Sequence, residues 1–136
     1  MKVWKVLNKL SDGSLVSAWA TRSWMKRYSR GHWTRARKFG SGETVAFLYG
    51  FRSLYDAQLF ARDMVLIMRR SVSYQIWEAE AVVDRHKPMV ASYQAWDCFW
   101  LRSGRSRARY GEPAPPGSVL CKAIRLVRRV DGEAAK

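Results

Sequence analysis

Residues 19–38 combine cationic and aromatic side chains in a pattern that suits a nucleic acid. The segment carries seven Lys or Arg residues and no Asp or Glu, and four aromatic rings are interleaved with the cations. Cations follow a phosphate backbone, while aromatic rings stack on bases with roughly 1–3 kcal/mol for each base. Here we expect phosphate contacts from Arg27, Arg30, Arg35, Arg37 and Lys38, and stacking from Trp24, Tyr28 and Trp33. The same groups also fit a nucleotide clamped by Arg, or core tryptophans beside a solvated rim.

A second basic stretch, residues 102–109, holds four arginines separated by small or polar residues. The guanidinium is a planar fork of donors that matches two phosphate oxygens, which a Lys ammonium is not. We expect phosphate contacts, from a loop that orders on a polyanion, by Arg105, Arg107 and Arg109. A solvated surface loop explains the same residues. An ordinary exposed strand face accounts for Arg125, Arg128 and Arg129.

Glu78 and Glu80 are the carboxylates whose spacing best suits chemistry. They lie two residues apart on a predicted strand, so both point to the same face. Two close carboxylates can split their pKa values and serve as acid and base. In a chain with this many arginines, we expect them instead to pair with cationic neighbours. The Glu-x-Glu tripeptide resembles that of ADP-ribosyltransferases, which would imply a small transferase that uses Glu80.

Other catalytic and metal-binding patterns are missing from the sequence. His32 and His86 have no local signature that joins them to Cys98 or Cys121, and the spacing typical of metal ligands is lacking. The glycines at 40 and 42 are not followed by the Gly-Lys-Ser/Thr of a phosphate-binding loop. We therefore expect no catalytic residue, no metal and no cofactor.

The net charge indicates the kind of partner. The chain has 25 Lys and Arg residues against 11 Asp and Glu, which gives a formal net charge of +14. These charges repel one another in the folded state, and a polyanion relieves that repulsion and releases counterions when it binds. We expect DNA, RNA or a nucleotide-like anion as the partner, with an acidic host protein as an alternative. A basic surface that only keeps the protein soluble would have the same composition.

The hydrophobic pattern predicts a single basic α+β domain over residues 1–130 and a frayed tail at 131–136. Residues 29–43 lack a steady period and predict a long loop, with a short strand at Trp33 and Thr34. Alternating apolar runs between turn signals predict strands at 2–7, 15–20, 24–28, 44–51, 74–83 and 119–130. The expected fold is a twisted, mostly antiparallel sheet with one main helix packed on a face.

That helix is predicted at about residues 53–70. Ser53 is a suitable N-cap, and Asp56 places a negative charge in the first turn. Apolar residues recur at three- and four-residue steps from Leu54 to Met68, which gives the helix one apolar face. We expect this face to cover the sheet.

Three short patches resemble small single-domain proteins of bacteriophages and prophages. They are residues 2–7, the Gly-x-Trp-Thr segment at 31–34, and residues 76–80. The resemblance implies an origin in a virus or mobile element, whose small proteins often bind nucleic acids or block host defences. It adds a viral anti-defence inhibitor of another protein as an alternative function.

The N-terminal residues and the cysteines indicate the compartment. The chain does not open with the long apolar core of a signal peptide, and the longest apolar run, residues 64–68, is too short to span a bilayer. Neither cysteine belongs to a paired motif, so we expect free thiols. We expect a cytoplasmic protein, in the host cytoplasm if viral, without membrane contact. Exposed tryptophans would allow a monomer or a homodimer.

Overall fold

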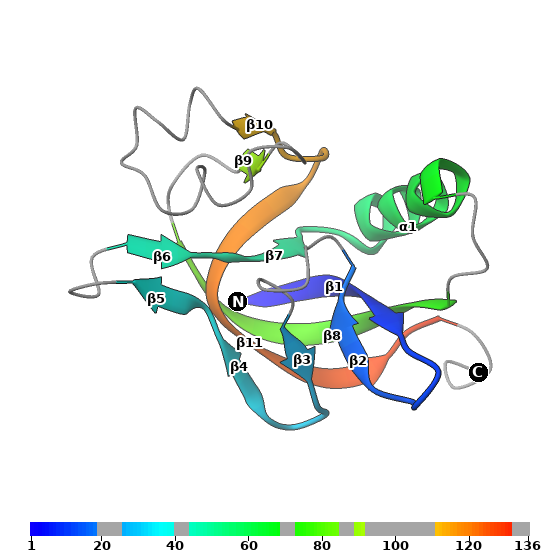
Figure 1. Ribbon diagram of the computed structural model, residues 1–136, viewed down its shortest axis with the longest axis horizontal. Coiled ribbons are helices and arrows are strands. Elements are labelled where there is room, and N and C mark those ends of the chain that lie inside the picture. The colour runs from blue at the N-terminus through cyan, green and yellow to red at the C-terminus, as the bar shows by residue number, and fades with distance from the viewer. Residues whose placement is uncertain (19–25, 40–43, 69–72, 85–88, 92–110, 132–136) are drawn as a thin grey trace.

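The computed structural model describes residues 1–18, 26–39, 44–68, 73–84, 89–91 and 111–131. Within these ranges the chain forms a strongly curved antiparallel sheet with a helix against it (Figure 1). The mostly antiparallel sheet with a helix is confirmed. The sequence did not predict that the sheet would curl into a small barrel.

Seven strands make up the main sheet. They are β1 (Lys2–Lys9), β2 (Leu15–Ser17), β3 (Arg27–Tyr28), β4 (Trp33–Arg35), β7 (Leu48–Phe51), β8 (Ser73–Val83) and β11 (Ser118–Arg129). Two separate pairs are formed by β5 (Arg37–Phe39) with β6 (Thr44–Ala46), and by β9 (Met89–Ala91) with β10 (Gly111–Pro113). The helix α1 (Leu54–Met68) lies between β7 and β8 in the chain.

Strand β8 lies between β1 and β11 and pairs with both along most of its length. At one end β7 bridges β1 and β11, because Phe51 is opposite both Trp4 and Ser118. At the other end β2 and β3 continue from β1, and β4 continues from β11. There Thr34 Oγ1 donates a hydrogen bond of 3.0 Å to Arg27 O, which joins β4 to β3. A sheet closed in this way encloses its own core.

Alternate residues of the long strands fill the interior. The fully buried apolar side chains include Val3, Leu7, Ala79, Cys121, Ile124 and Leu126. On β8 the small residues Ala79 and Ala81 point inward, while Glu80 and Val82 are exposed. The predicted separation of the two faces of this strand is therefore confirmed.

Two irregularities in β11 decide which of its side chains face outward. The register with β8 shifts between Cys121 and Ala123, and again between Leu126 and Arg128. A bulge adds one residue and so reverses the alternation beyond it. As a result Lys122 and Arg125 both reach solvent although three positions separate them, with side chains 58% and 38% exposed.

The helix packs on the outside of the barrel and builds a second core there. Ser53 caps it as predicted: Ser53 Oγ accepts from Asp56 N at 3.1 Å and donates to Asp56 Oδ2 at 2.8 Å. Phe60 lies with its ring centroid 5.2 Å from that of Phe51. This outer core consists mainly of Trp4, Val6, Phe51, Ala57, Phe60 and Ile76. The predicted packing of the helix on a face of the sheet is confirmed.

Two predictions about irregular segments are corrected in part. The short strand predicted at Trp33 and Thr34 is confirmed as β4, but the remainder of residues 29–43 was predicted as a loop and 37–39 form β5. Three-residue strands are too short to show a period, and β4 is held by pairing with the distant β11. Asp131 is not frayed: its Oδ1 accepts from Ile76 N at 2.9 Å and from Arg129 Nε at 3.0 Å. Residues 132–136 lie outside the described ranges.

Gly117, just before β11, packs against the start of α1. Its φ is +78°, and a Cβ added there would overlap the carboxylate of Asp56. We expect Gly117→Ala to lower the free energy of unfolding by more than the roughly 1–3 kcal/mol of a strained φ, because the Asp56 carboxylate must also move. Gly13→Ala is the control, since Gly13 has φ +87° and an added Cβ meets nothing within 4 Å. Urea unfolding compares them, and equal losses would contradict the overlap.

Candidate functional site

One row of side chains crosses the outer face of the sheet in register. Lys2 of β1 lies opposite Glu80 of β8. Arg125 of β11 lies opposite Glu80 on one side and Trp33 of β4 on the other. Because strands are spaced by roughly 4.7–4.9 Å, neighbours in such a row are in contact range. We call Lys2, Glu80, Arg125 and Trp33 the cross-strand row.

Arg125 joins two other members of this row, Trp33 and Glu80. Its guanidinium carbon lies 5.1 Å from the centroid of the Trp33 ring, and its Nη2 donates to Glu80 Oε2 at 2.6 Å. A cation over an indole ring is worth about 0.5–1 kcal/mol at an exposed site. The ion pair with Glu80 fixes the guanidinium of Arg125, and the guanidinium in turn contacts the Trp33 ring. Trp33 is therefore positioned by contacts while 40% of it remains exposed.

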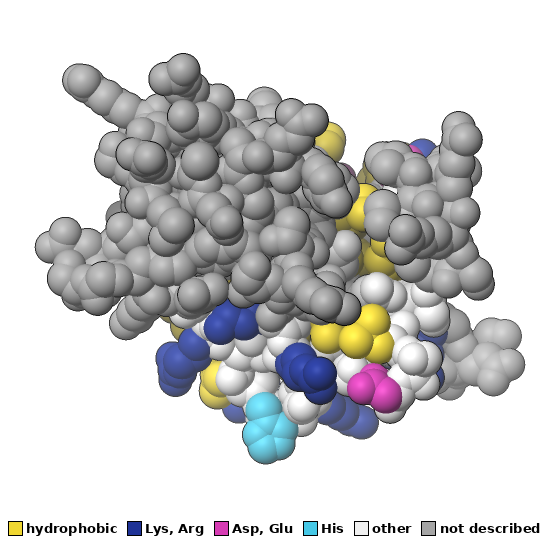
Figure 2. Space-filling view, viewed as in Figure 1, with side chains coloured by type: hydrophobic (Ala, Val, Ile, Leu, Met, Phe, Trp, Pro, Cys, Tyr) yellow, Lys and Arg dark blue, Asp and Glu magenta, His cyan; other side chains and the backbone are white. Residues whose placement is uncertain are grey.

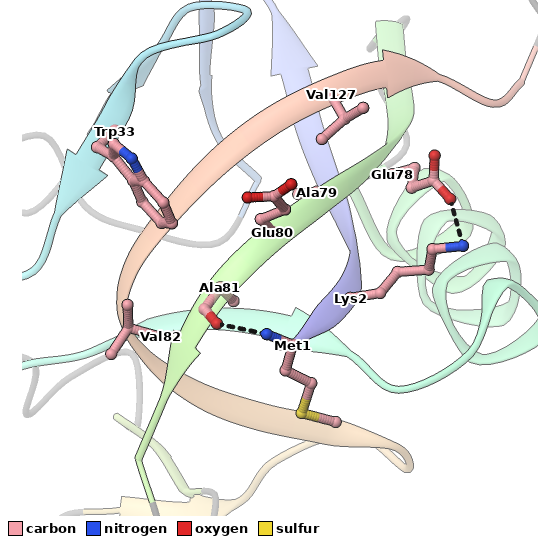
Figure 3. Close-up of a pocket in the computed structure, with 9 residues that line it drawn as sticks. All are labelled: Met1, Lys2, Trp33, Glu78, Ala79, Glu80, Ala81, Val82 and Val127. Atoms are coloured by element: carbon pink, nitrogen blue, oxygen red, sulfur yellow. Dashed lines mark hydrogen bonds and ion pairs between the residues drawn. The ribbon is translucent and has the colours of Figure 1, made fainter.

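An open depression of about 590 Å³ lies beside the row (Figure 3). Trp33 and Val82 lie on one side of it and Val127, Glu78 and Lys2 on the other, with Glu80 between them. Its lining includes four of the five exposed large hydrophobic residues of the described chain, namely Met1, Trp33, Val82 and Val127. The depression is thus a largely apolar surface with two carboxylates, those of Glu78 and Glu80, in its lining.

Glu78 and Glu80 form the ion pairs that the sequence predicted. Glu78 accepts from Lys2 Nζ at 2.7 Å and from Arg128 Nε at 2.8 Å, and only 12% of its side chain is exposed. The hydrogen bonds from Lys2 and then Arg128 hold the pKa of Glu78 below its usual range. Among the described residues Glu80 has one such partner, Arg125, and 52% of its side chain is exposed. Glu80 is therefore the carboxylate with room for a further donor.

The segment from β3 to β4 brings cations to the edge of this face. Arg30 Nε donates to Val127 O at 3.0 Å, and Gly31 N donates to Leu126 O at 3.0 Å, which fixes the turn on β11. Arg35 lies two residues after Trp33 on the same strand and so faces the same side. Within the described ranges, no carboxylate lies within 4.0 Å of a cationic nitrogen of Arg27, Arg30 or Arg35. We call these three residues the hairpin arginines.

The space-filling view is consistent with this uneven distribution of charge. Lys and Arg side chains cluster at the lower edge of the molecule, over the end of the sheet formed by β2, β3 and β4 (Figure 2). Acidic side chains are scarce on the part of that edge that is coloured. Elsewhere in the described chain the cations of Lys2, Arg62, Lys122, Arg128 and Arg129 lie beside carboxylates. The cations at the hairpin edge therefore have capacity for an external anion.

One predicted stacking residue is placed where it cannot stack on a ligand. Tyr28 is only 4% exposed and belongs to the interior core, because it is the inward-facing residue of β3. Its hydroxyl is buried and forms no hydrogen bond that meets normal geometry within the described part of the chain, and burial raises its pKa while the nearby Ser17 opposes that rise. The prediction that Tyr28 stacks on a base is corrected accordingly.

The other predicted site residues divide into three groups. The structure brings Trp33, Arg30 and Arg35 together on one face, with Arg27 on the adjacent strand. Only the backbone is described at Arg37 and Lys38, which lie in β5. Outside the described residues lie Trp24, Arg105, Arg107 and Arg109. Sequence reasoning missed Arg125 as the partner of Trp33, because only strand pairing joins them.

The interior holds a charged residue that the sequence did not predict. Lys5 is 6% exposed, donates from Nζ to Tyr49 O at 2.6 Å, and lies 5.2 Å from the centroid of the Tyr28 ring. Burial lowers the pKa of Lys5 from 10.5 to about 8, and the neighbouring Cys121 opposes that shift. Cys121 is a free, buried thiol, as predicted, and burial raises its pKa to about 11. The alternation of β1 sends Lys5 inward between Val3 and Leu7.

Two negative observations apply to the described ranges alone. No three His, Cys, Asp or Glu side chains there come together as a group that could hold a metal ion. Across the same part of the chain, no helix combines the length and the apolar character that crossing a membrane requires.

The function of this face has to follow from its own chemistry. The resemblance of three patches to phage proteins stays a prediction, because none of the contacts above bears on it. Comparisons with protein-family models, with curated proteins and with solved structures found no match to this chain.

Proposed function

We propose that this protein binds single-stranded nucleic acid, or another phosphate-rich anion that carries a flat ring, without catalysis. The binding face consists of the cross-strand row and the hairpin arginines. One observation carries the proposal: the exposed ring of Trp33, held by Arg125, lies on the same strand face as Arg35 and beside the turn that carries Arg30. Cations beside an accessible aromatic ring are the elements of single-strand recognition.

The charge distribution supports the proposal that phosphates bind at the hairpin arginines. None of Arg27, Arg30 and Arg35 forms an ion pair within the described residues, although Asp12 and Arg27 interact electrostatically at longer range. A phosphate there gains charge-assisted hydrogen bonds without breaking an ion pair. Arg30 is also held in place by the hydrogen bond from its Nε to Val127 O, and this bond does not use its terminal nitrogens. A cation held in place loses less side-chain freedom when it binds.

The exposure of Trp33 and its contact with Arg125 support the proposal that a base stacks on this ring. Arg125 fixes the ring from one side, and 40% of the residue stays exposed. Stacking on such a ring contributes roughly 1–3 kcal/mol for each base and does not depend strongly on sequence. A ring that is already held loses little freedom on binding, so most of this stacking energy appears as affinity.

The experiment compares Trp33→Leu with the wild type in binding a fluorescent single-stranded oligonucleotide, followed by anisotropy. Loss of one stacked base should weaken binding by roughly 5- to 150-fold, which corresponds to the 1–3 kcal/mol of one stack. Tyr55→Leu is the matched control, because Tyr55 is 67% exposed but lies on α1. If both variants bind like the wild type, or if no oligonucleotide binds at low salt, the proposal is wrong.

An acidic protein partner is the second candidate, and one observation favours it. Four of the five exposed large hydrophobic residues of the described chain line one depression, as the centre of a protein interface often does. A stoichiometric partner that remains bound after nuclease treatment would support this anti-defence alternative. Binding that weakens steeply with salt and disappears after nuclease treatment would support nucleic acid. The alternative that Glu80 serves a transferase stays a prediction without a supporting contact.

A further inference from the structure

We infer that the depression beside Trp33 takes a single unpaired nucleobase and that Glu80 selects bases with N–H donors on their Watson–Crick edge, guanine first. This inference rests on the proposed function and adds a preference to it. It follows from the combination of an aromatic ring, an apolar surface and one accessible carboxylate, Glu80, in the lining of the depression.

The shape and lining of the depression fit a neutral, flat group. Its volume of about 590 Å³ falls within the roughly 300–1,000 Å³ of small-molecule sites. Trp33, Val82 and Val127 offer it apolar contacts from both sides. A base ring can lie against such a surface, whereas a phosphate would lose its water there and face two carboxylates. The base therefore occupies the depression and the phosphate stays outside it.

Glu80 is the group that can distinguish one base from another. A carboxylate only accepts hydrogen bonds, and its two oxygens offer about four lone-pair directions. Arg125 Nη2 uses one of them, on Oε2, and half of the side chain is exposed. The remaining directions require donors from the ligand. Glu78 does not compete for this role, because it already accepts from Lys2 and Arg128 and is only 12% exposed.

The donor patterns of the bases set the order of preference. Guanine presents a ring N–H and an amino group side by side, which match two carboxylate lone pairs. Adenine and cytosine present one amino group beside a ring nitrogen that accepts. Uracil and thymine place one N–H between two carbonyl oxygens, which the carboxylate repels. Because these donors are used in base pairing, only an unpaired base can offer them, and the site therefore favours single strands.

The hairpin arginines determine on which side of the depression the phosphate of the bound nucleotide lies. Arg35 lies on the strand that carries Trp33, and Arg30 lies in the turn just before that strand, where its Nε donates to Val127 O. On the other side of the depression, Lys2 and Arg128 already pair with Glu78. A phosphate attached to the bound base therefore finds its unpaired cations towards β4.

The test uses the full chain and displaces a labelled single-stranded oligonucleotide with GMP, AMP, CMP or UMP. For the wild type we expect GMP to compete best and UMP worst, by about tenfold or more, as a charged hydrogen bond implies. Glu80→Gln replaces one acceptor oxygen by an amide donor, so the preference for GMP over UMP should fall below about threefold. UMP should compete as well as before or better.

Two further variants keep the result interpretable. Asp63→Asn removes the same charge from α1, where the side chain is 59% exposed, and should leave the order of the nucleotides unchanged. Val82→Trp adds a ring at a position that is 49% exposed and lines the depression, so it should weaken GMP competition even if Glu80→Gln folds poorly. Thermal unfolding of each variant shows whether its fold is retained.

The outcomes separate this inference from the function on which it rests. If the oligonucleotide binds with steep salt dependence but the four nucleotides compete equally, the base preference is wrong and the proposed function stands. If GMP is preferred and that preference survives both Glu80→Gln and Val82→Trp, the depression is not the base site. If neither the oligonucleotide nor any nucleotide binds, both the function and the inference fail.

Discussion

Lys5→Met is expected to make the protein more stable at neutral pH, although it removes a hydrogen bond. Lys5 is 6% exposed and surrounded by the barrel core, and desolvation lowers its pKa from 10.5 to about 8. At about 1.36 kcal/mol for each pKa unit, keeping this ammonium charged inside the fold costs about 3 kcal/mol. The bond from Nζ to Tyr49 O returns about 1 kcal/mol or somewhat more. Methionine has a similar length and no charge, so we expect a net gain of about 1–2 kcal/mol.

The pH dependence of this gain identifies its cause. The folded pKa of Lys5, about 8, lies below the ordinary value of 10.5, so the unfolded chain binds more protons between these two values. The stability contributed at Lys5 therefore rises with pH through that window and is lowest below it. Lys5→Met lacks this titration. Its advantage over the wild type should be constant below about pH 8 and fall by about 3 kcal/mol towards pH 10.5, where the wild type becomes the more stable protein.

Urea unfolding of both proteins at about pH 7 and about pH 10 measures the difference. Cys121 and Tyr28 face Lys5, and both have raised pKa values, so they remove stability as the pH rises through their unfolded values. They are present in both proteins, so the comparison between wild type and variant subtracts their own burial effects and leaves only the interaction of Cys121 with Lys5. A difference in free energy that does not change with pH would show that the pKa of Lys5 is not lowered inside the barrel.

Replacing Arg27 and Arg35 together by alanine is expected to weaken nucleic-acid binding strongly and to reduce its dependence on salt. Both side chains are exposed, and neither has a carboxylate of the described chain within 4.0 Å. Each phosphate contact on a single strand contributes about 0.7 to the slope of log affinity against log salt, so losing two should reduce the slope by about 1.4. At low salt we expect affinity to fall by about tenfold or more.

A matched pair of substitutions tests whether the position of the charge matters. Arg52→Ala with Arg62→Ala removes the same net charge at the start of α1 and along it, where both residues are exposed. This control should retain most of the salt slope, because the effect of exposed charges is screened beyond about 10 Å at 0.1 M ionic strength. Equal losses in the two double variants would mean that the overall charge binds the polyanion, without a defined face. Fluorescence anisotropy across a salt series provides both slopes.

Local chemistry made several parts of this protein predictable from sequence. The cap of α1 depends on Ser53 and Asp56, which are three residues apart, so the hydrogen bonds between them need no distant partner. The two faces of β8 follow from the alternation around Ala79 and Glu80. The ion pairs of Glu78 and Glu80 follow from the excess of Lys and Arg, which makes a cationic neighbour the rule.

The sequence alone therefore determined the helix, the long strands, the large positive charge and the set of side chains from which a site could be built. Only the tertiary structure decided which of them meet. Pairing of β4 with β11 places Arg125 against Trp33, and closure of the barrel turns Tyr28 and Lys5 inward. The physical reason is that register between distant strands and the curvature of the sheet depend on the packing of the whole core. A run of neighbouring residues records its own alternation, but it does not record which strand will lie beside it.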